Sequence, residues 1–249
     1  MRERFSLYDG AVTLEFDRTK HAYFEGGERL DSVTGILGVL AKPKLVPWAV
    51  GQTCAHIAGK LGAGVKLDEL QIRRILAEAR LAHVVERDAA ADIGTIVHLF
   101  AEQWIRGFNP ALPADPKARN GAQAFLRWIG AHRVEFKHCE RPIFSRRHRY
   151  AGTMDLEAVI DGRLAIGDFK TSAAIWPEMR FQTAAYEMAR REEEGIDYGP
   201  RWILRFDTET GMFEAKPLPV EDLEKDFAAF LGAQAASRRL RELKNEHRG

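Results

Sequence analysis

Alternating hydrophobic and polar positions open the chain and give way to a helical pattern. AVTLEF and HAYFEG on either side of DRTK predict a hairpin, and Ser32 or Thr34 can cap a short helix through ILGVL. Apolar residues then recur with helical spacing, which predicts helices near 47–61, 67–90, 92–106 and 118–133. The segments GAG (62–64) and NPALPADP (109–116) are the expected breaks between them.

The pattern changes to that of a β-sheet from residue 134 onward. VEFKHCERPIF, YAGTMDLEAVI and RLAIGDFKT are short, rich in β-forming residues and separated by turn residues, so they predict consecutive strands. A helix over 177–194, two strands at 201–207 and 212–218, and a helix over 220–243 complete the expected order. We predict one α/β (α+β) domain over 1–249, with a central mixed sheet flanked by helices. Its parts are a hairpin and helical region at 1–133, the sheet at 134–218 and a C-terminal helix at 219–249.

The dipeptide Asp161-Gly162 places two acidic residues on neighbouring strands. It is the strongest short signal for a two-residue type I′ turn, and counting outward from that turn puts Asp155 across from Asp168. Directly opposed side chains lie about 4.5–5.5 Å apart at Cβ, and two carboxylates so close repel unless a cation lies between them. Lys170 is two residues from Asp168 and shares its face of the strand.

Oxygen ligands of this kind favour a hard cation such as Mg²⁺ or Mn²⁺ over a structural zinc ion. Such an ion lowers the pKa of water and neutralises phosphoryl oxygens, and Lys170 would orient or deprotonate the water or stabilise the transition state. The expected chemistry is hydrolysis of a phosphodiester.

Composition narrows the class of protein. Hydrophobic residues make up 45% and charged residues 29% of the 249 positions, which is ordinary for a globular protein. A formal charge of +1 means that nucleic-acid affinity must come from a local basic patch. Cys54 and Cys139 fit no CxxC pattern, and no leader or membrane span is evident, so we expect a cytoplasmic protein with reduced thiols.

Several of these motifs together resemble the PD-(D/E)XK nuclease superfamily. GTMDLEAVIDGRLAIGDFKTS is similar to its G-x-x-D…(D/E)-x-K core, FQTAAYEMA to the QxxxY motif of its RecB-like branch, and DIGTIVH to the GTxxH helix of that branch. SVTGILGVL followed by Trp48 resembles the start of phage and mitochondrial exonucleases of this type. The resemblance implies a restriction-endonuclease-like core with an N-terminal helical region and one or two Mg²⁺ or Mn²⁺ ions.

The resemblance also assigns roles to individual residues. It makes His98 a metal ligand with Asp155 and Asp168, gives the backbone carbonyl of Phe169 to the metal, and makes Glu140 the acid of the first motif. The expected catalytic residues are Asp155, Asp168, Lys170, Glu140, Gln182 and Tyr186. Some relatives carry four cysteines for an iron–sulfur cluster; this chain has two, at a different spacing, and we expect no cluster.

Basic and aromatic residues elsewhere are candidates for contact with DNA. Arg146, Arg147 and Arg149 lie on a turn before the Asp155 strand, and Lys42, Lys44 and Trp48 combine charge with an aromatic ring. The arginines could equally lie on an ordinary solvated turn.

The candidate metal and catalytic residues also have plainer interpretations. His98 could be a hydrogen-bonded core histidine and Glu140 a surface charge. Gln182 and Tyr186 could simply form an interfacial helix face. Glu157 is expected to be a supporting or solvent residue on the face of Asp155.

We therefore expect a metal-dependent DNA nuclease. An exonuclease in recombination, repair or phage genome processing is the leading hypothesis, acting on single- or double-stranded DNA ends, with a recombination or single-strand-binding protein as partner. A structure- or site-specific endonuclease and a non-catalytic DNA-binding module with the same fold are the alternatives.

Overall fold

The computed structural model describes residues 2–61 and 65–247. The chain divides into two compact units: Met1–Leu40 together with Val97–Gly249, and Ala41–Ile96. The prediction of one domain over 1–249 stays a prediction. The expected break at 62–64 lies outside the described residues.

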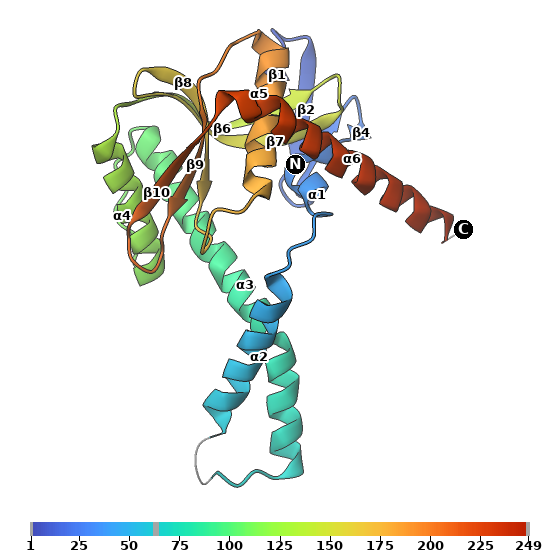
Figure 1. Cartoon of the computed structure of the whole chain (residues 1–249), viewed down its shortest axis with the longest axis vertical. Helices are drawn as coiled ribbons and strands as arrows, with labels where there is room; N and C mark the ends of the chain where they lie inside the picture. Colours follow the sequence, from blue (N-terminus) through green and yellow to red (C-terminus); the bar gives the residue numbers. More distant parts are fainter. Residues whose placement is uncertain (1, 62–64, 248–249) are drawn as a thin grey trace. The chain divides into compact units, whose positions relative to one another are not determined.

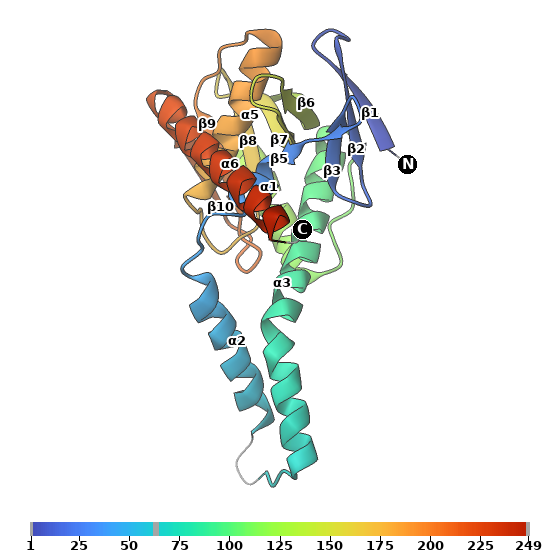
Figure 2. The same ribbon diagram turned by 90° about the vertical axis from the view of Figure 1, so that its right-hand side faces the viewer.

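Strands and helices follow one another in the order that Figures 1 and 2 label. The strands are β1 (Arg2–Leu7), β2 (Val12–Asp17), β3 (Ala22–Glu25), β4 (Glu28–Arg29), β5 (Asp31–Ser32), β6 (Val134–Ser145), β7 (Tyr150–Ile160), β8 (Arg163–Lys170), β9 (Arg201–Phe206) and β10 (Phe213–Leu218). The helices are α1 (Val33–Leu37), α2 (Leu45–Lys60), α3 (Glu69–Ile105), α4 (Pro116–Ala131), α5 (Glu178–Glu194) and α6 (Leu223–Glu246), with a 3₁₀ turn at Val220–Asp222.

A small antiparallel sheet in the order β1-β2-β3-β4 begins the chain. Its β2–β3 pair is the predicted hairpin, with Phe16 opposite Tyr23. Strand β1 was not predicted, because only Phe5 and Leu7 mark its alternation among charged and polar residues. Ser32 caps α1 by accepting a hydrogen bond from the Gly35 N–H at 3.1 Å, which decides between the two predicted caps.

The larger sheet confirms the predicted fold class. Its strand order is β10-β9-β8-β7-β5, with β6 also paired to β7. It is mixed, because β8–β9 and β5–β7 are parallel while β6–β7, β7–β8 and β9–β10 are antiparallel. The sheet is flanked by helices, as Figure 1 shows for α4, α5 and α6.

Different helices cover the two faces of this sheet. Ile166 of β8 packs in a core with Tyr186 of α5 and Phe230 of α6. Phe169, three residues further along the strand and so on the opposite face, packs on Phe125 of α4 with the ring centroids 6.0 Å apart. Strand β8 is therefore buried from both sides, and charged side chains on it lie in a protein interior.

Helix α3 corrects the prediction of two helices at 67–90 and 92–106. It runs without interruption from Glu69 to Ile105. Asp68 and Gln71 exchange hydrogen bonds of 2.7 and 2.9 Å at its start, a capping box. A run of three alanines at 89–91 favours helix strongly, and a single glycine at 94 weakens a helix by about 1 kcal/mol without ending it.

The unit Ala41–Ile96 contains α2 and the first part of α3. The two helices lie side by side in Figure 2, and His56 Nε2 lies 3.4 Å from Glu78 Oε2. Among the described residues of 41–96, Ile75 and Ala79 are buried and α2 contributes none. The unit therefore has a small core.

Within 2–61 and 65–247, no helix combines the length and the apolar character needed to cross a membrane.

Candidate metal and catalytic site

The hairpin that carries the site forms as the sequence predicts. Asp161 and Gly162 have φ of 50° and 88°, both left-handed as a type I′ turn requires. Ile160 pairs with Arg163, and the ladder continues in that register to Leu156 opposite Gly167. The predicted register is confirmed for these pairs.

The two strands part at the next step, where the two aspartates lie. The described pairs between β7 and β8 end at Leu156 and Gly167, and from there β8 pairs with the parallel strand β9. The Phe169 N–H donates a hydrogen bond of 2.7 Å to Asp155 Oδ2. The Asp155 carboxylate thus accepts a hydrogen bond from the backbone of β8. Asp155 and Asp168 themselves lie one residue beyond the last pair of the β7–β8 ladder.

Three predicted residues form a cluster that could hold a metal ion. One ligand atom each from His98, Glu140 and Asp155 lies within 4.8 Å of the others. His98 Nδ1 is 3.8 Å from Asp155 Oδ2 and 4.0 Å from Glu140 Oε1. These separations are too long for hydrogen bonds, and they are about twice the ~2.1 Å between Mg²⁺ and a ligand atom. The donor set fits a small divalent cation.

Glu140 reaches the cluster through an unusual backbone conformation. Its φ is 51°, in the left-handed region, which disfavours a residue with a side chain by about 1–2 kcal/mol. Cys139 pairs with Leu156 and Arg141 with Met154, so Glu140 falls opposite Asp155. This position brings a carboxylate of β6 beside that of β7, and the role of Glu140 as the acid of the first motif stays a prediction.

Asp168 and Lys170 form a buried ion pair next to this cluster. Asp168 is 0% exposed, and its Oδ2 contacts Lys170 Nζ. Gln182 Nε2 donates to Asp168 Oδ1 at 3.1 Å and to the Tyr186 hydroxyl at 2.8 Å. Helix α5 therefore supports the acid of β8 through the predicted Gln182 and Tyr186. Asp168 is not among the three residues grouped as metal ligands.

Burial and neighbouring charges act against each other on the pKa values of the site, and the net shifts of Asp155, Asp168 and Lys170 are all upward. Burial raises the pKa of Asp168 to about 6, although Lys170 opposes the rise. Burial also raises the pKa of Asp155 against the effect of His98 and Lys170. For Lys170, burial lowers the pKa, but Asp168 and Asp155 outweigh it and the net direction is upward. The site thus concentrates carboxylates that a cation would stabilise.

His98 responds to the same carboxylates. Burial lowers its pKa, but Asp155 and Glu140 together outweigh burial and raise it. Its ring lies edge-on to Phe169, with centroids 5.9 Å apart, so packing fixes its orientation. The predicted metal role for the Phe169 carbonyl stays a prediction.

The predicted DNA-contacting arginines lie on the β6–β7 turn. Arg149 pairs with Glu25 at 2.8 Å and with Glu28 at 2.9 Å, so its charge is largely neutralised. Arg146 stacks over the Tyr8 ring at 5.4 Å, and the Arg147 N–H donates to Glu192. Asp155 lies six positions after Arg149, which is about 20 Å along an extended strand. The turn is therefore not part of the cluster.

The remaining candidates belong to the other unit. Lys42 and Lys44 precede α2, and Trp48 lies in its first turn. Their contact with DNA stays a prediction.

Two features near the site were missed or misjudged from the sequence. Glu157, expected beside Asp155 as a supporting or solvent residue, is buried and accepts hydrogen bonds from Arg190 (3.2 Å) and Tyr198 (3.0 Å). The hydroxyl groups of Tyr23 of β3 and Thr153 form a hydrogen bond of 2.7 Å. Burial raises the pKa of Tyr23, and the nearby Glu140 carboxylate raises it further. No local pattern in the sequence signals either contact.

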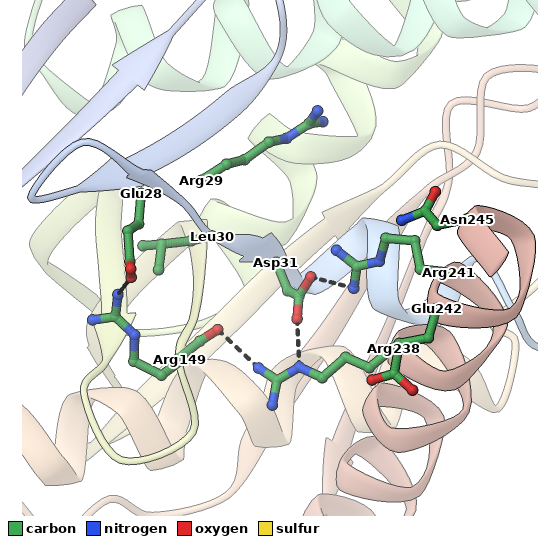
Figure 3. A pocket seen from close by; sticks show the side chains of 9 residues that line it. All are labelled: Glu28, Arg29, Leu30, Asp31, Arg149, Arg238, Arg241, Glu242 and Asn245. Carbon is green, nitrogen blue, oxygen red and sulfur yellow. Dashed lines mark hydrogen bonds and ion pairs between the residues drawn. The ribbon is translucent and has the colours of Figure 1, made fainter. Parts of the chain in front are cut away.

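A cavity of about 380 Å³ lies apart from the cluster, between the β4–β5 edge and α6. Figure 3 shows Arg238 and Arg241 both directed at Asp31, at 2.8 and 2.6 Å. Its charges are mostly paired, and it contains no residue of the cluster.

The resemblance to the PD-(D/E)XK nucleases depends on the motif residues alone. Its weight depends on His98, Glu140, Asp155, Asp168 and Lys170, and it stays a prediction. The sequence matches no protein-family model, and no curated protein matches it.

Proposed function

We propose that the chain is a divalent-metal-dependent deoxyribonuclease of the PD-(D/E)XK type. The observation that carries the proposal is the convergence of His98, Glu140 and Asp155 within 4.8 Å, beside a buried Asp168–Lys170 pair. Several titratable groups with perturbed pKa values gathered around a buried acid and lysine are typical of catalytic sites.

The ligand atoms for one or two ions of Mg²⁺ or Mn²⁺ come from the clustered side chains. His98, Glu140 and Asp155 would hold one ion, and Asp168 would join them when Lys170 moves aside. A bound ion would lower the pKa of water and neutralise charge on the phosphoryl oxygens.

The chain's own groups supply positioning and charge. Lys170 is an ammonium group held by Asp168, and it would orient the attacking water or stabilise negative charge in the transition state. Gln182 fixes Asp168 by donating to Oδ1, so the carboxylate cannot rotate freely. Burial raises the pKa of Tyr186 well above 10, so its hydroxyl keeps its proton and can donate to a phosphate oxygen.

DNA is the proposed substrate, and an exonuclease that acts on its ends is the proposed activity. Arg146 and Arg147 on the β6–β7 turn are the cations that would contact the phosphate backbone. Recombination, repair or phage genome processing would use such an activity, with a recombination or single-strand-binding protein as partner.

The test is degradation of end-labelled linear DNA by the purified full-length chain. Activity should require Mg²⁺ or Mn²⁺, stop with EDTA, and fall at least about a hundredfold in Asp155→Asn and in Lys170→Met. Lys137→Met, an exposed lysine of β6, is the matched control and should keep full activity. Undiminished cleavage by the Asp155→Asn/Lys170→Met double variant would refute the site.

Two further measurements separate the alternatives. Covalently closed circular DNA should survive an exonuclease, so its cleavage would favour the endonuclease. Calorimetric binding of DNA without cleavage under any metal condition would favour the non-catalytic module.

A further inference from the structure

Helix α2 exposes apolar side chains that its own unit does not cover. Val46, Val50 and Leu61 are 70%, 56% and 53% exposed. The sequence from Leu45 to Gly59 contains no Asp, Glu, Lys or Arg. Contiguous exposed apolar surface on a helix without charges is typical of an interaction site.

These apolar residues belong to one stripe along the helix. Val46, Val50, Cys54, Ile57 and Leu61 follow at intervals of four, four, three and four residues, which places them on one face. Within this α2 stripe Ile57 is half-buried, as is His56, which approaches Glu78 of α3. Ile72 and Leu76 of α3 are also exposed and continue the apolar surface beside it.

The α2 stripe reads almost the same in both directions. Its spacing is close to symmetric about Cys54, with Val46 and Leu61 at the ends and Val50 and Ile57 between. About a two-fold axis across the helices, each stripe residue lies level with the partner residue at the same distance on the other side of the axis, so symmetric spacing aligns the apolar layers of the two copies.

We infer that a second copy of this chain covers the α2 stripe, with the two α2 helices antiparallel and a two-fold axis passing close to Cys54. In this arrangement Val46 packs against the partner's Leu61, and Val50 against the partner's Ile57. The two Cys54 side chains lie next to each other. The inference does not depend on the nuclease proposal.

Charge disfavours other occupants. A nucleic acid needs cations to neutralise its phosphates, and helices that lie on a membrane surface are rich in lysine and arginine on their polar face. Lys60 is the first charged residue within α2. A neutral, self-similar face fits a second copy without like-charge repulsion.

The size of the contact sets its strength. Sixteen residues give α2 a length of about 24 Å, and with the neighbouring side of α3 the face is about 20 Å wide. Its projected area of about 500 Å² is close to the lower end of stable interfaces, about 600 Å² on each partner. We therefore expect a dimer that dissociates on dilution.

Sedimentation equilibrium of the full chain over a range of concentrations tests the dimer. Wild type should shift from one to two chain masses as concentration rises. Val46→Glu and Leu61→Lys alter exposed positions and should each weaken self-association about tenfold or more, because burying an unpaired charge disfavours the contact. An equimolar mixture of the two variants should recover association, since the new carboxylate of one chain then faces the new ammonium group of the other. Leu240→Glu, at an exposed leucine of α6, is the matched control and should associate as wild type does.

Oxidative cross-linking tests the position of the axis. Cys54 is exposed, whereas burial raises the pKa of Cys139 to about 12, so Cys54 is the reactive thiol. A disulfide-linked dimer should form in wild type and in Cys139→Ser, and be lost in Cys54→Ser. A single-chain mass at all concentrations, or a dimer unaffected by Val46→Glu and by Leu61→Lys, would overturn the inference. Monomers that bind vesicles of anionic and zwitterionic lipid would overturn it in favour of a membrane surface.

Discussion

Removing the charge of Asp168 should change how stability depends on pH in the metal-free protein. The ordinary pKa of an aspartate is 3.8, and burial raises that of Asp168 to about 6. Because the folded pKa is the higher one, the folded state binds the proton more tightly than the unfolded state. The stability from this group is therefore fully present below pH 3.8 and is lost as pH rises through 6.

The magnitude follows from the difference between the two pKa values. At about 1.4 kcal/mol for each pH unit, a rise from 3.8 to about 6 corresponds to about 3 kcal/mol. Asp168 is fully buried, so solvent screening does not reduce this figure. Relative to Asp168→Asn, wild type should lose about 2.4 kcal/mol of unfolding free energy between pH 4 and pH 7, because part of the total is already lost at pH 4.

Denaturant unfolding in EDTA at several pH values measures the effect. The informative quantity is the wild-type unfolding free energy minus that of Asp168→Asn, because the lost contact with Lys170 is a constant offset while the lysine stays charged. Asp197→Asn, with a side chain 95% exposed, is the matched control. A difference for Asp168→Asn that stays flat from pH 4 to 7, or that rises, would refute the reasoning.

Three further perturbations follow from the described contacts. Mn²⁺ at a hundred times its dissociation constant should stabilise wild type by about 2.7 kcal/mol in thermal unfolding, and His98→Ala should lose most of this at the same concentration. Arg190→Met should lower the free energy of unfolding by about 3–5 kcal/mol, because it leaves Glu157 buried without its cation. Adding Glu157→Gln should recover much of that loss. Equal losses in the single and double variants would contradict this prediction. Gly121→Ala should destabilise by about 1–3 kcal/mol, since the new methyl would meet a valine methyl at 2.5 Å, whereas Gly130→Ala in the same helix meets nothing within 4 Å and should stabilise by up to about 1 kcal/mol.

Local rules predict much of the hairpin that carries the site. One Asp-Gly step fixes the turn type, and the turn fixes the register, so the proximity of Asp155 to the end of β8 follows from counting. The position of Lys170 beside Asp168 follows from strand alternation in the same way.

The contacts that the sequence does not predict depend on tertiary structure. The far edge of β8 at Asp168 pairs with β9, which is distant in sequence, so the environment of this end of the strand does not follow from the hairpin alone. The left-handed φ of Glu140 arises in β6 without a glycine or asparagine to signal it. Glu157 finds Arg190 only after α5 packs on the sheet, so its burial could not be predicted from alternation alone.

The way β8 sits between β7 and β9 has a consequence for the order of biosynthesis. His98, Glu140 and Asp155 come from three separate elements, and Gln182 of α5, which holds Asp168, is synthesised after all of them. The parallel partner of β8 emerges later still, and Phe230 of α6 later again. A ribosome-bound chain therefore carries these acidic groups before it has the parallel strand and the helix that pack around them.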